Sequence, residues 1–254
     1  MSDIATNAIS SSEGQQPCEA KTVRSGYVLE IGASRNGVDV DAAEAAGKLR
    51  SGRYAFRFVK RTFDVVFSAA VLVLLSWLFA IIAIAIKVDD PKGPVIFKQT
   101  RVGKDGREFK MYKFRSMCVD AEAKLAQLQA LNEKTGPVFK MAEDPRITRV
   151  GHVIRKLSLD ELPQFVNVLK GDMSIVGPRP ALPKEVATYT PRQHQRLLVR
   201  CGLTCYWQTR RNQDSITFDE WVELDLAYVK KCSIWADFKL IIQTIGVVLT
   251  AQGS

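Results

Sequence analysis

The sequence predicts a mixed α/β, mostly helical protein with one membrane-embedded helix near its N-terminal end. Three observations support this class. An uncharged apolar run covers 65–86, a strand–turn–strand pattern follows over 94–107, and amphipathic segments with helical spacing occupy much of the remainder. With 254 residues and 46% apolar side chains, the chain can form one globular core together with a membrane element.

The charge of the chain indicates an anionic partner. The formal net charge is +9, which fits nucleic acid, anionic lipid headgroups or phosphorylated substrates. The chain has 5 cysteines, none in a CxxC pair, and 2 histidines. This composition favours reduced thiols with ordinary packing roles over a zinc site.

The N-terminal part is polar and then strongly basic. Residues 1–47 contain few apolar side chains, so we expect a disordered tail, and the first residues lack the pattern of a cleavable secretory signal. Basic and aromatic residues alternate over 48–63, which is typical of a segment that approaches an anionic bilayer.

The apolar run 65–86 is long enough to cross a hydrocarbon core of roughly 30 Å. Basic residues flank it on both sides, so the distribution of positive charge leaves two topologies open. The helix either spans the membrane or enters it, bends and returns to the same face. The shared basic character of the flanks favours the re-entrant form.

The segments after the apolar run suggest a compact domain. A basic, aromatic strand or loop is expected over 109–117 and a surface helix over 119–132. Residues 233–249 predict a helix that either lies in the membrane interface or packs against the core. We therefore expect three regions: a tail at 1–47, a basic anchor with the membrane helix at 48–92, and a cytosolic domain at 93–254.

The acidic pair Asp160 and Glu161 has two interpretations. Ser158 and Glu161 have the spacing of a capping box, and acidic residues in a first turn complement the helix dipole. A purely structural role is therefore reasonable. Pro163 complicates it, because a helix that began at Ser158 would bring the proline ring against a carbonyl, so the helix starts later. Gly171 is placed to end that helix.

Basic residues that surround this pair in the sequence suggest either a salt-bridge network or a phosphate site. A carboxylate in such a site can attack phosphorus while a divalent cation screens the charge. The residues concerned are Lys113, Arg115, Arg146, Arg149, Arg155 and Arg179.

Five segments carry a resemblance to a known family: KRTFDVV, GPVIFKQTRVG, YKFRSM, RKLSLDELPQFVNVLKGDMSIVGPRP and GLTCYWQ. Together they resemble the bacterial sugar transferase family, the monotopic phosphoglycosyl transferases, from about Lys60 to the C-terminus. The long run from LSLDELPQ to GPRP is much more specific than a short motif. Because of this run, we interpret Asp160 and Glu161 as catalytic residues and not as helix-capping residues.

The resemblance implies an activity and a location. Members transfer a sugar-1-phosphate from a UDP-sugar to polyprenyl (undecaprenyl) phosphate through a covalent aspartyl intermediate, and they release UMP. This phosphotransferase reaction is the first membrane step of exopolysaccharide or glycoconjugate synthesis, at the cytoplasmic face of the bacterial inner membrane. The family's membrane helix is re-entrant and bends at a Ser-Pro pair, where this chain has Ser76-Trp77.

The resemblance also assigns site residues and a cofactor. Asp160 corresponds to the nucleophile and Glu161 to the second catalytic carboxylate, and the two would hold Mg²⁺. The positions expected to bind substrate are Lys113, Arg115, Arg155, Arg179, Pro180, Arg211 and Asn212. Arg211 and Asn212 belong to a loop after Trp207 that is one residue shorter than in many members.

Two other functions remain to be weighed. A membrane-anchored nucleotide or phosphate sensor without catalysis would use the same basic residues, but both carboxylates are retained. A nucleic-acid-binding protein would have no use for the apolar run and would carry a recognisable module. The expected partners are thus UDP-sugar, polyprenyl phosphate and membrane lipids, with no nucleic acid. The sequence leaves the sugar and a homodimer open.

Overall fold

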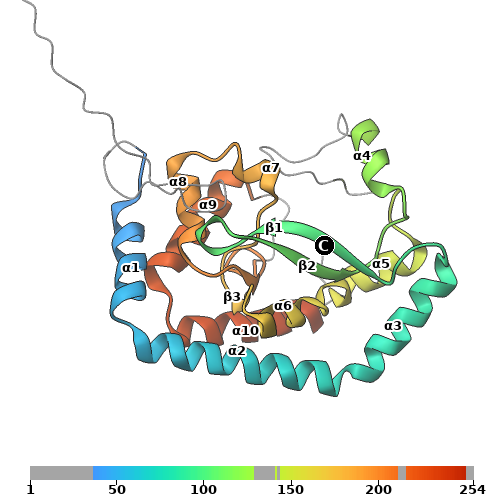
Figure 1. The fold of residues 1–254 in the computed structure, drawn as a ribbon, viewed down its shortest axis with the longest axis horizontal. Coiled ribbons are helices and arrows are strands. Elements are labelled where there is room, and N and C mark those ends of the chain that lie inside the picture. Colours follow the sequence, from blue (N-terminus) through green and yellow to red (C-terminus); the bar gives the residue numbers. More distant parts are fainter. Residues whose placement is uncertain (1–36, 129–140, 142–143, 211–215, 250–254) are drawn as a thin grey trace, which may run out of the picture.

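The computed structural model describes residues 37–128, 141, 144–210 and 216–249 (Figure 1). The mixed α/β, mostly helical part of the prediction is confirmed, since helices dominate and the described strands form two small sheets. The helices are α1 Val40–Ser51, α2 Tyr54–Leu74, α3 Ser76–Asp89, α4 Ala121–Leu128, α5 Arg149–Lys156, α6 Gln164–Lys170, α7 Pro183–Val186, α8 Pro191–His194, α9 Phe218–Lys231 and α10 Ile234–Leu249. The strands and short 3-10 helices are β1 Ile96–Val102, η1 Lys104–Gly106, β2 Glu108–Phe114, η3 Leu159–Glu161, β3 Ser174–Val176, η4 Gln195–Leu198 and β4 Gly202–Thr204.

Helices α2 and α3 form a bent pair along one edge of the molecule (Figure 1). No one helix among the described residues is both long enough and apolar enough to cross a bilayer, whereas the pair together meets those criteria with a bend of 61°. Leu75 lies at the break, with φ −98° and ψ 10°, directly before Ser76-Trp77. The bend is therefore present at a Ser-Trp pair, where the resemblance predicted a Ser-Pro pair.

Many apolar side chains are exposed along this pair, at surface positions where a soluble protein would carry polar side chains. Exposed examples beyond the first turns of α2 are Phe63, Val66, Val73, Leu74, Trp77, Ile81, Ile84 and Val88. Helix α10 has a similar surface, with exposed Trp235, Phe238, Ile242 and Ile245, while its Leu240 and Ile241 are buried. Helix α10 thus packs against the core, as one alternative for 233–249 had it, and its exposed apolar face leaves the membrane-interface alternative as a prediction.

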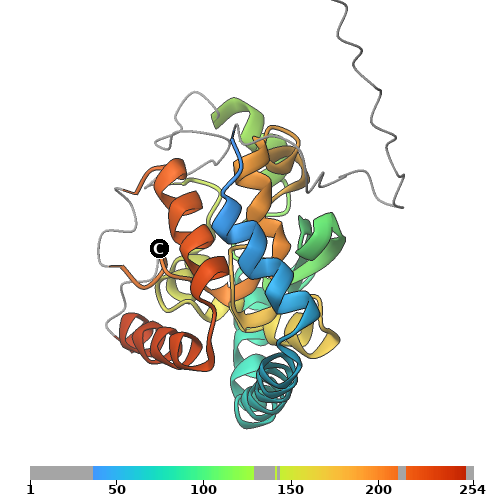
Figure 2. The ribbon, with the colours of Figure 1, turned by 90° about the vertical axis from the view of Figure 1, so that its left-hand side faces the viewer.

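The expected tail at 1–47 is wrong from Val40 onward, because α1 begins there. Asp39 caps this helix by accepting a hydrogen bond from the backbone N–H of Ala42, and it also pairs with Lys230 of α9 at 2.8 Å. Ala42 and Ala46 are buried, and Figure 2 shows α1 beside α9. The polar composition of this segment did not indicate a packed helix. The helix packs closely through two small buried side chains, Ala42 and Ala46, which contribute little to the apolar content.

Strands β1 and β2 form the predicted hairpin. They pair antiparallel from Ile96 opposite Phe114 to Val102 opposite Glu108. The turn between them needs left-handed backbone at Asp105 (φ 57°) and Gly106 (φ 74°), which aspartate and glycine tolerate better than most residues. The hairpin carries Lys113 near its C-terminal end.

Helix α2 is fastened to the core of the domain. Arg61 donates to the carbonyls of Val168 and Leu169 at the end of α6, where the last carbonyls of a helix lack partners. The buried Asp64 accepts hydrogen bonds from the hydroxyl of Ser174 and the N–H of Ile175 on β3. The bent pair and the centre of the domain therefore form one packed unit.

The segment around the acidic pair departs from the capping-box interpretation. Ser158 has left-handed backbone (φ 54°) and caps nothing with its side chain. Leu159–Glu161 form a single 3-10 turn, and α6 starts only at Gln164, as Pro163 required. Gly171, at φ 89°, ends α6 as expected. The surface helix expected over 119–132 is observed as α4, and its last expected residues lie outside the described part.

Candidate active site

Asp160 and Glu161 lie on the short turn η3, between α5 and α6. The left-handed Ser158 reverses the chain after α5, and Pro163 prevents α6 from extending back over the acidic pair. The side chain of Asp160 is 11% exposed and that of Glu161 is 29% exposed. The turn thus holds two carboxylates side by side, one nearly buried and one partly open.

Lys113 of β2 contacts both carboxylates. Its Nζ lies 2.6 Å from Oε1 of Glu161, to which it donates a hydrogen bond, and 3.7 Å from Oδ2 of Asp160. Lys113 and Glu161 are 48 residues apart in the sequence, so this contact depends on the tertiary fold. It confirms that the expected catalytic pair and one expected basic residue meet.

The two carboxyl groups have opposite pKa shifts. Burial raises the pKa of Asp160 above its usual value, the neighbouring Glu161 adds to this, and the charges of Lys113 and Arg155 oppose it. Burial would also raise the pKa of Glu161, but the charge and hydrogen bond of Lys113, with the charges of Arg179 and Arg101, lower it. The surroundings therefore favour the ionised form of Glu161 more than that of Asp160.

A small pocket opens beside Glu161. It is lined by residues from the hairpin, the acidic turn, the segment after β3 and the segment around β4: Arg101, Met111, Lys113, Glu161, Gln164, Arg179, Pro180, Gly202, Leu203 and Gln208. The expected residues Lys113, Glu161, Arg179 and Pro180 therefore meet in one place. Arg155 lies on α5, on the side of Asp160, where its charge lowers the pKa of that carboxyl.

Arg101 is a pocket residue that the sequence interpretation missed. It is 7% exposed, and its guanidinium donates to the side chain of Gln99 and to the carbonyl of Pro180. Burial and the charge of Arg179 lower its pKa to about 10. Among the described residues no carboxylate forms a salt bridge with it. An anion in the pocket would offset this buried charge. Its place in the segment GPVIFKQTRVG was a signal that could have identified it.

Arg179 lies against two stacked tryptophans. The rings of Trp207 and Trp221 are 4.4 Å apart and nearly parallel, and the guanidinium carbon of Arg179 is 5.9 Å from each ring centre. An arginine held against aromatic faces loses fewer conformations when it binds an anion. The backbone of GPRP and this pair together position Arg179 in the pocket.

Arg115 does not join the pocket. Its buried guanidinium pairs with the carboxylate of Asp90 at 2.9 Å and also donates to the Asp90 carbonyl, so it connects β2 to the end of α3. Arg115 therefore has a structural contact in the fold, and its expected substrate-binding role stays a prediction. Arg146 is similarly paired with Asp144. Arg211 and Asn212 lie outside the described residues.

The acidic pair can be compared with the needs of a magnesium ion. In the described part of the chain, no group of three or more His, Cys, Asp or Glu side chains could hold a metal ion. Mg²⁺ commonly takes only one or two protein carboxylates and completes its shell with waters and substrate phosphates. Asp160 and Glu161 therefore fit a magnesium ion that is shared with a phosphorylated substrate.

Comparisons with known proteins identify the family of the chain. Residues 55–251 match the family described as bacterial sugar transferase. The galactosyl transferase CpsE of Streptococcus agalactiae serotype III is 45% identical over 202 residues, 80% of this chain and 44% of that protein. The undecaprenyl-phosphate galactose phosphotransferase of Salmonella typhimurium is 42% identical over 203 residues, 78% of this chain and 42% of that protein.

A relative of similar length also matches. The exopolysaccharide production protein ExoY of Rhizobium meliloti is 38% identical over 199 residues, which are 77% of this chain and 87% of that protein. The chain spans less than half the length of the two relatives from Streptococcus and Salmonella. The family match covers both carboxylates, the basic pocket and the bent helix pair, and the chain belongs to the bacterial sugar transferase family.

Proposed function

We propose that this protein transfers a sugar-1-phosphate from a UDP-sugar to polyprenyl (undecaprenyl) phosphate and releases UMP. The observation that carries the proposal is the contact of Lys113 with both Asp160 and Glu161, at the edge of a pocket that Glu161 and Lys113 line together with Arg179 and Arg101. Relatives whose names describe undecaprenyl-phosphate sugar phosphotransferases support it. The step would begin the synthesis of an exopolysaccharide or another glycoconjugate.

In the first half of the reaction, a carboxylate oxygen of Asp160 attacks the sugar-bearing phosphorus. A bond forms between that oxygen and phosphorus, and the bond from phosphorus to the bridging oxygen of the diphosphate breaks. UMP leaves with the bonding electrons, and the sugar phosphate remains on Asp160. Positive groups such as Lys113 and Arg179 would stabilise the charge on the phosphate oxygens, which is the main task in phosphoryl transfer.

In the second half, an oxygen of polyprenyl phosphate attacks the same phosphorus. A diphosphate bond forms, the bond to Asp160 breaks, and the carboxylate is regenerated. Dividing one exchange into two displacements lets a single charged pocket serve a water-soluble donor and a lipid acceptor in turn. Glu161, kept ionised by Lys113, would hold that lysine next to the reacting carboxylate.

Mg²⁺ would be held by Asp160 and Glu161 together with phosphate oxygens, and it would screen negative charge when bound. Excess EDTA should then stop UMP release, and added Mg²⁺ should restore it. Full activity in excess chelator would remove the metal from the proposal.

The proposal also concerns how the bent helix pair lies relative to the membrane. We infer that α2 and α3 enter the bilayer and return, so that the acidic turn faces the cytoplasm at the membrane surface. The 61° bend and the exposed apolar side chains of α2, α3 and α10 support this placement. Both substrates could then reach Asp160, one from the cytosol and one from the lipid.

The direct test uses the purified full chain, undecaprenyl phosphate and a panel of UDP-sugars, with UMP release as the readout. We expect UMP with at least one donor and none from Asp160→Asn. The competing function, a non-catalytic sensor, predicts binding of the UDP-sugar without any UMP. That result, repeated across the panel with Mg²⁺ present, would overturn the proposal.

A further inference from the structure

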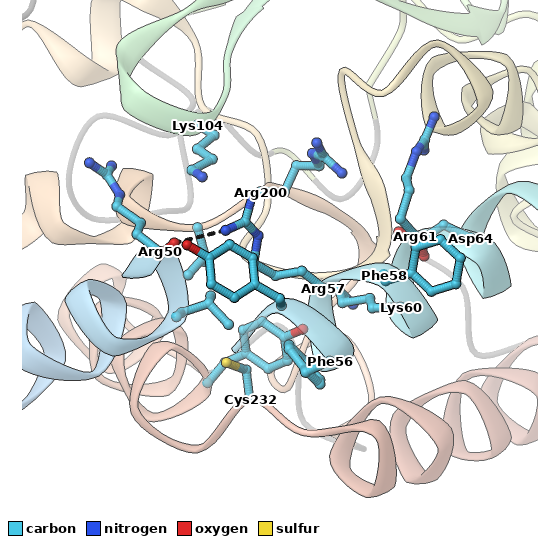
Figure 3. A pocket seen from close by; sticks show the side chains of 14 residues that line it. Arg50, Phe56, Arg57, Phe58, Lys60, Arg61, Asp64, Lys104, Arg200 and Cys232 are labelled. Carbon is cyan, nitrogen blue, oxygen red and sulfur yellow. Dashed lines mark hydrogen bonds between the residues drawn. The ribbon is translucent and has the colours of Figure 1, made fainter. Parts of the chain in front are cut away.

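A second and larger pocket lies away from the acidic turn. Its volume is about 550 Å³, and it shares no lining residue with the pocket beside Glu161. Figure 3 shows Lys104, Arg50 and Arg200 above the cavity and Phe56 and Cys232 below it. Helices α1, α2 and α9, the turn η1 and the segment before β4 contribute to its walls.

The pocket is rich in positive charge. Its basic residues are Arg50, Arg57, Lys60, Arg61, Lys104 and Arg200. Some of them already have partners within the protein: Arg50 pairs with Asp105, and Lys60 pairs with Asp237 at 2.6 Å. For Lys104 and Arg200, the described part of the chain provides no carboxylate within salt-bridge distance. These two cations are therefore available to an anion.

The cations also repel one another. Burial lowers the pKa of Lys104, the charge of Asp105 opposes this, and the charges of Arg50, Arg200 and Arg57 lower it further. Burial likewise lowers the pKa of Arg200, and the charges of Arg61 and Arg57 lower it further, while Asp64, a carboxylate of the pocket lining, partly opposes them. Like charges that share a partly buried site destabilise the folded protein unless a counter-charge offsets them. The positions of these groups thus favour an anionic occupant.

Apolar side chains continue from the pocket toward the bilayer-facing surface. Tyr54 and Phe58 of α2 line the pocket and are 67% and 73% exposed. Further along the same helix, Phe63 and Val66 are also exposed. An occupant with a charged head and a hydrocarbon tail could therefore contact the cations and the apolar face at once. A free phosphate would leave this apolar wall unused.

We propose that this pocket binds the phosphate headgroup of an anionic glycerophospholipid, whose acyl chains follow Tyr54 and Phe58 into the bilayer. Lys104 and Arg200 donate to the phosphate oxygens. The inference rests on the proposed membrane placement of α2. The acceptor lipid of the proposed reaction does not explain the pocket, because its phosphate has to reach Asp160, which does not line this cavity.

The test measures lipid retention by the full-length protein. The protein is purified from nanodiscs that contain phosphatidylglycerol and phosphatidylcholine, and native mass spectrometry counts the lipids that stay bound. We expect wild type to retain phosphatidylglycerol selectively. Lys104→Ala and Arg200→Ala should each weaken this retention by about tenfold, because each removes a charged hydrogen-bond donor.

Two controls distinguish the pocket from general attraction to a charged membrane. Lys239→Ala removes an exposed lysine of α10 that does not line the pocket and should leave retention unchanged. Soluble glycerophosphoglycerol, which has the headgroup without the chains, should compete poorly. Equal retention by the pocket variants and wild type would overturn the proposal. Displacement by the soluble headgroup as effective as by the lipid would show a free phosphoester site instead.

The same variants separate this inference from the proposed function. Neither Lys104 nor Arg200 lines the pocket beside Glu161, so both variants should release UMP from the UDP-sugar in detergent as wild type does. A wild-type protein that releases UMP but retains no phosphatidylglycerol refutes the lipid site alone. A protein that retains the lipid but never releases UMP refutes the transferase alone.

Discussion

The ammonium group of Lys113 lies 2.6 Å from a carboxylate oxygen of Glu161. This ion pair joins the β1–β2 hairpin to the acidic turn and places the same lysine 3.7 Å from Asp160. A single cation thus keeps Glu161 ionised and offsets part of the burial penalty on its neighbour. The arrangement thus favours the ionised form of Glu161 over that of the more buried Asp160, as the proposed roles of the two carboxylates require.

Replacing Lys113 should shift the pH dependence of transfer. The pKa of Asp160 is already raised by burial, so its reactive, ionised form is lost at a higher pH than for an ordinary aspartate as the solution is acidified. Lys113→Met removes a charge that lowers this pKa, so the acidic limb of kcat/KM should move to higher pH. Lys98→Met, an exposed lysine on the paired strand, is the control. An unmoved acidic limb in Lys113→Met would show that the lysine does not control Asp160.

Two arginines from the family segments should behave differently when replaced by methionine. Arg115→Met leaves Asp90 without its partner and should lower the free energy of unfolding by about 2 kcal/mol. Arg179→Met should change stability by less than about 1 kcal/mol but reduce kcat/KM by about a hundredfold, since its charge faces the pocket. Chemical unfolding and UMP release measure the two quantities. Normal stability with a selective rise of KM in Arg115→Met would restore its substrate-binding role.

The close approach of β3 and β4 leaves no room for a side chain at Gly202. A Cβ there would lie 2.1 Å from the backbone nitrogen of Gly177, so one strand would have to move. Gly202→Ala should cost about 3 kcal/mol of stability and reduce activity, because Gly202 also lines the pocket. Gly47→Ala, in α1 with no atom within 4 Å of its Cβ, should instead stabilise by about 0.5 kcal/mol. Equal melting temperatures for the two variants would contradict this packing.

Cysteine labelling tests the path of the bent pair. Ser51 and Lys92 are exposed residues on either side of α2 and α3, and each can be replaced by cysteine in a Cys18→Ser, Cys118→Ser background. A re-entrant pair predicts that an impermeant maleimide labels both positions from the cytoplasmic side only. A spanning pair would make the two positions react from opposite sides. Cys201, Cys205 and Cys232 are buried and provide little background.

Much of the fold could be predicted from local patterns. The hairpin followed from alternation and turn residues, and the end of α6 followed from Gly171. Helix α1 could not be predicted in this way, because what stabilises it is distant in sequence: Asp39 pairs with Lys230, and the two buried alanines pack within the folded domain. The composition of a segment gives its average polarity but does not indicate which part of the folded domain the segment packs against.

The site was predictable only in part, for a similar reason. The resemblance identified the acidic pair and the basic positions Lys113 and Arg179, which the fold brings together. It could not distinguish Arg115 from Arg101, because both are arginines within family segments. The difference lies in their partners: Asp90 neutralises Arg115, whereas Arg101 is bonded to neutral oxygens beside the pocket.

The most direct test of the account is to look for the sugar phosphate on residue 160. The protein is incubated with its UDP-sugar and Mg²⁺ without acceptor lipid, quenched, and digested for mass spectrometry. We expect the mass of one sugar phosphate on the peptide that contains Asp160, its disappearance when polyprenyl phosphate is added, and no adduct in Asp160→Asn. Sugar-phosphate transfer at the wild-type rate by Asp160→Asn, or an adduct on another residue, would contradict the covalent role of Asp160.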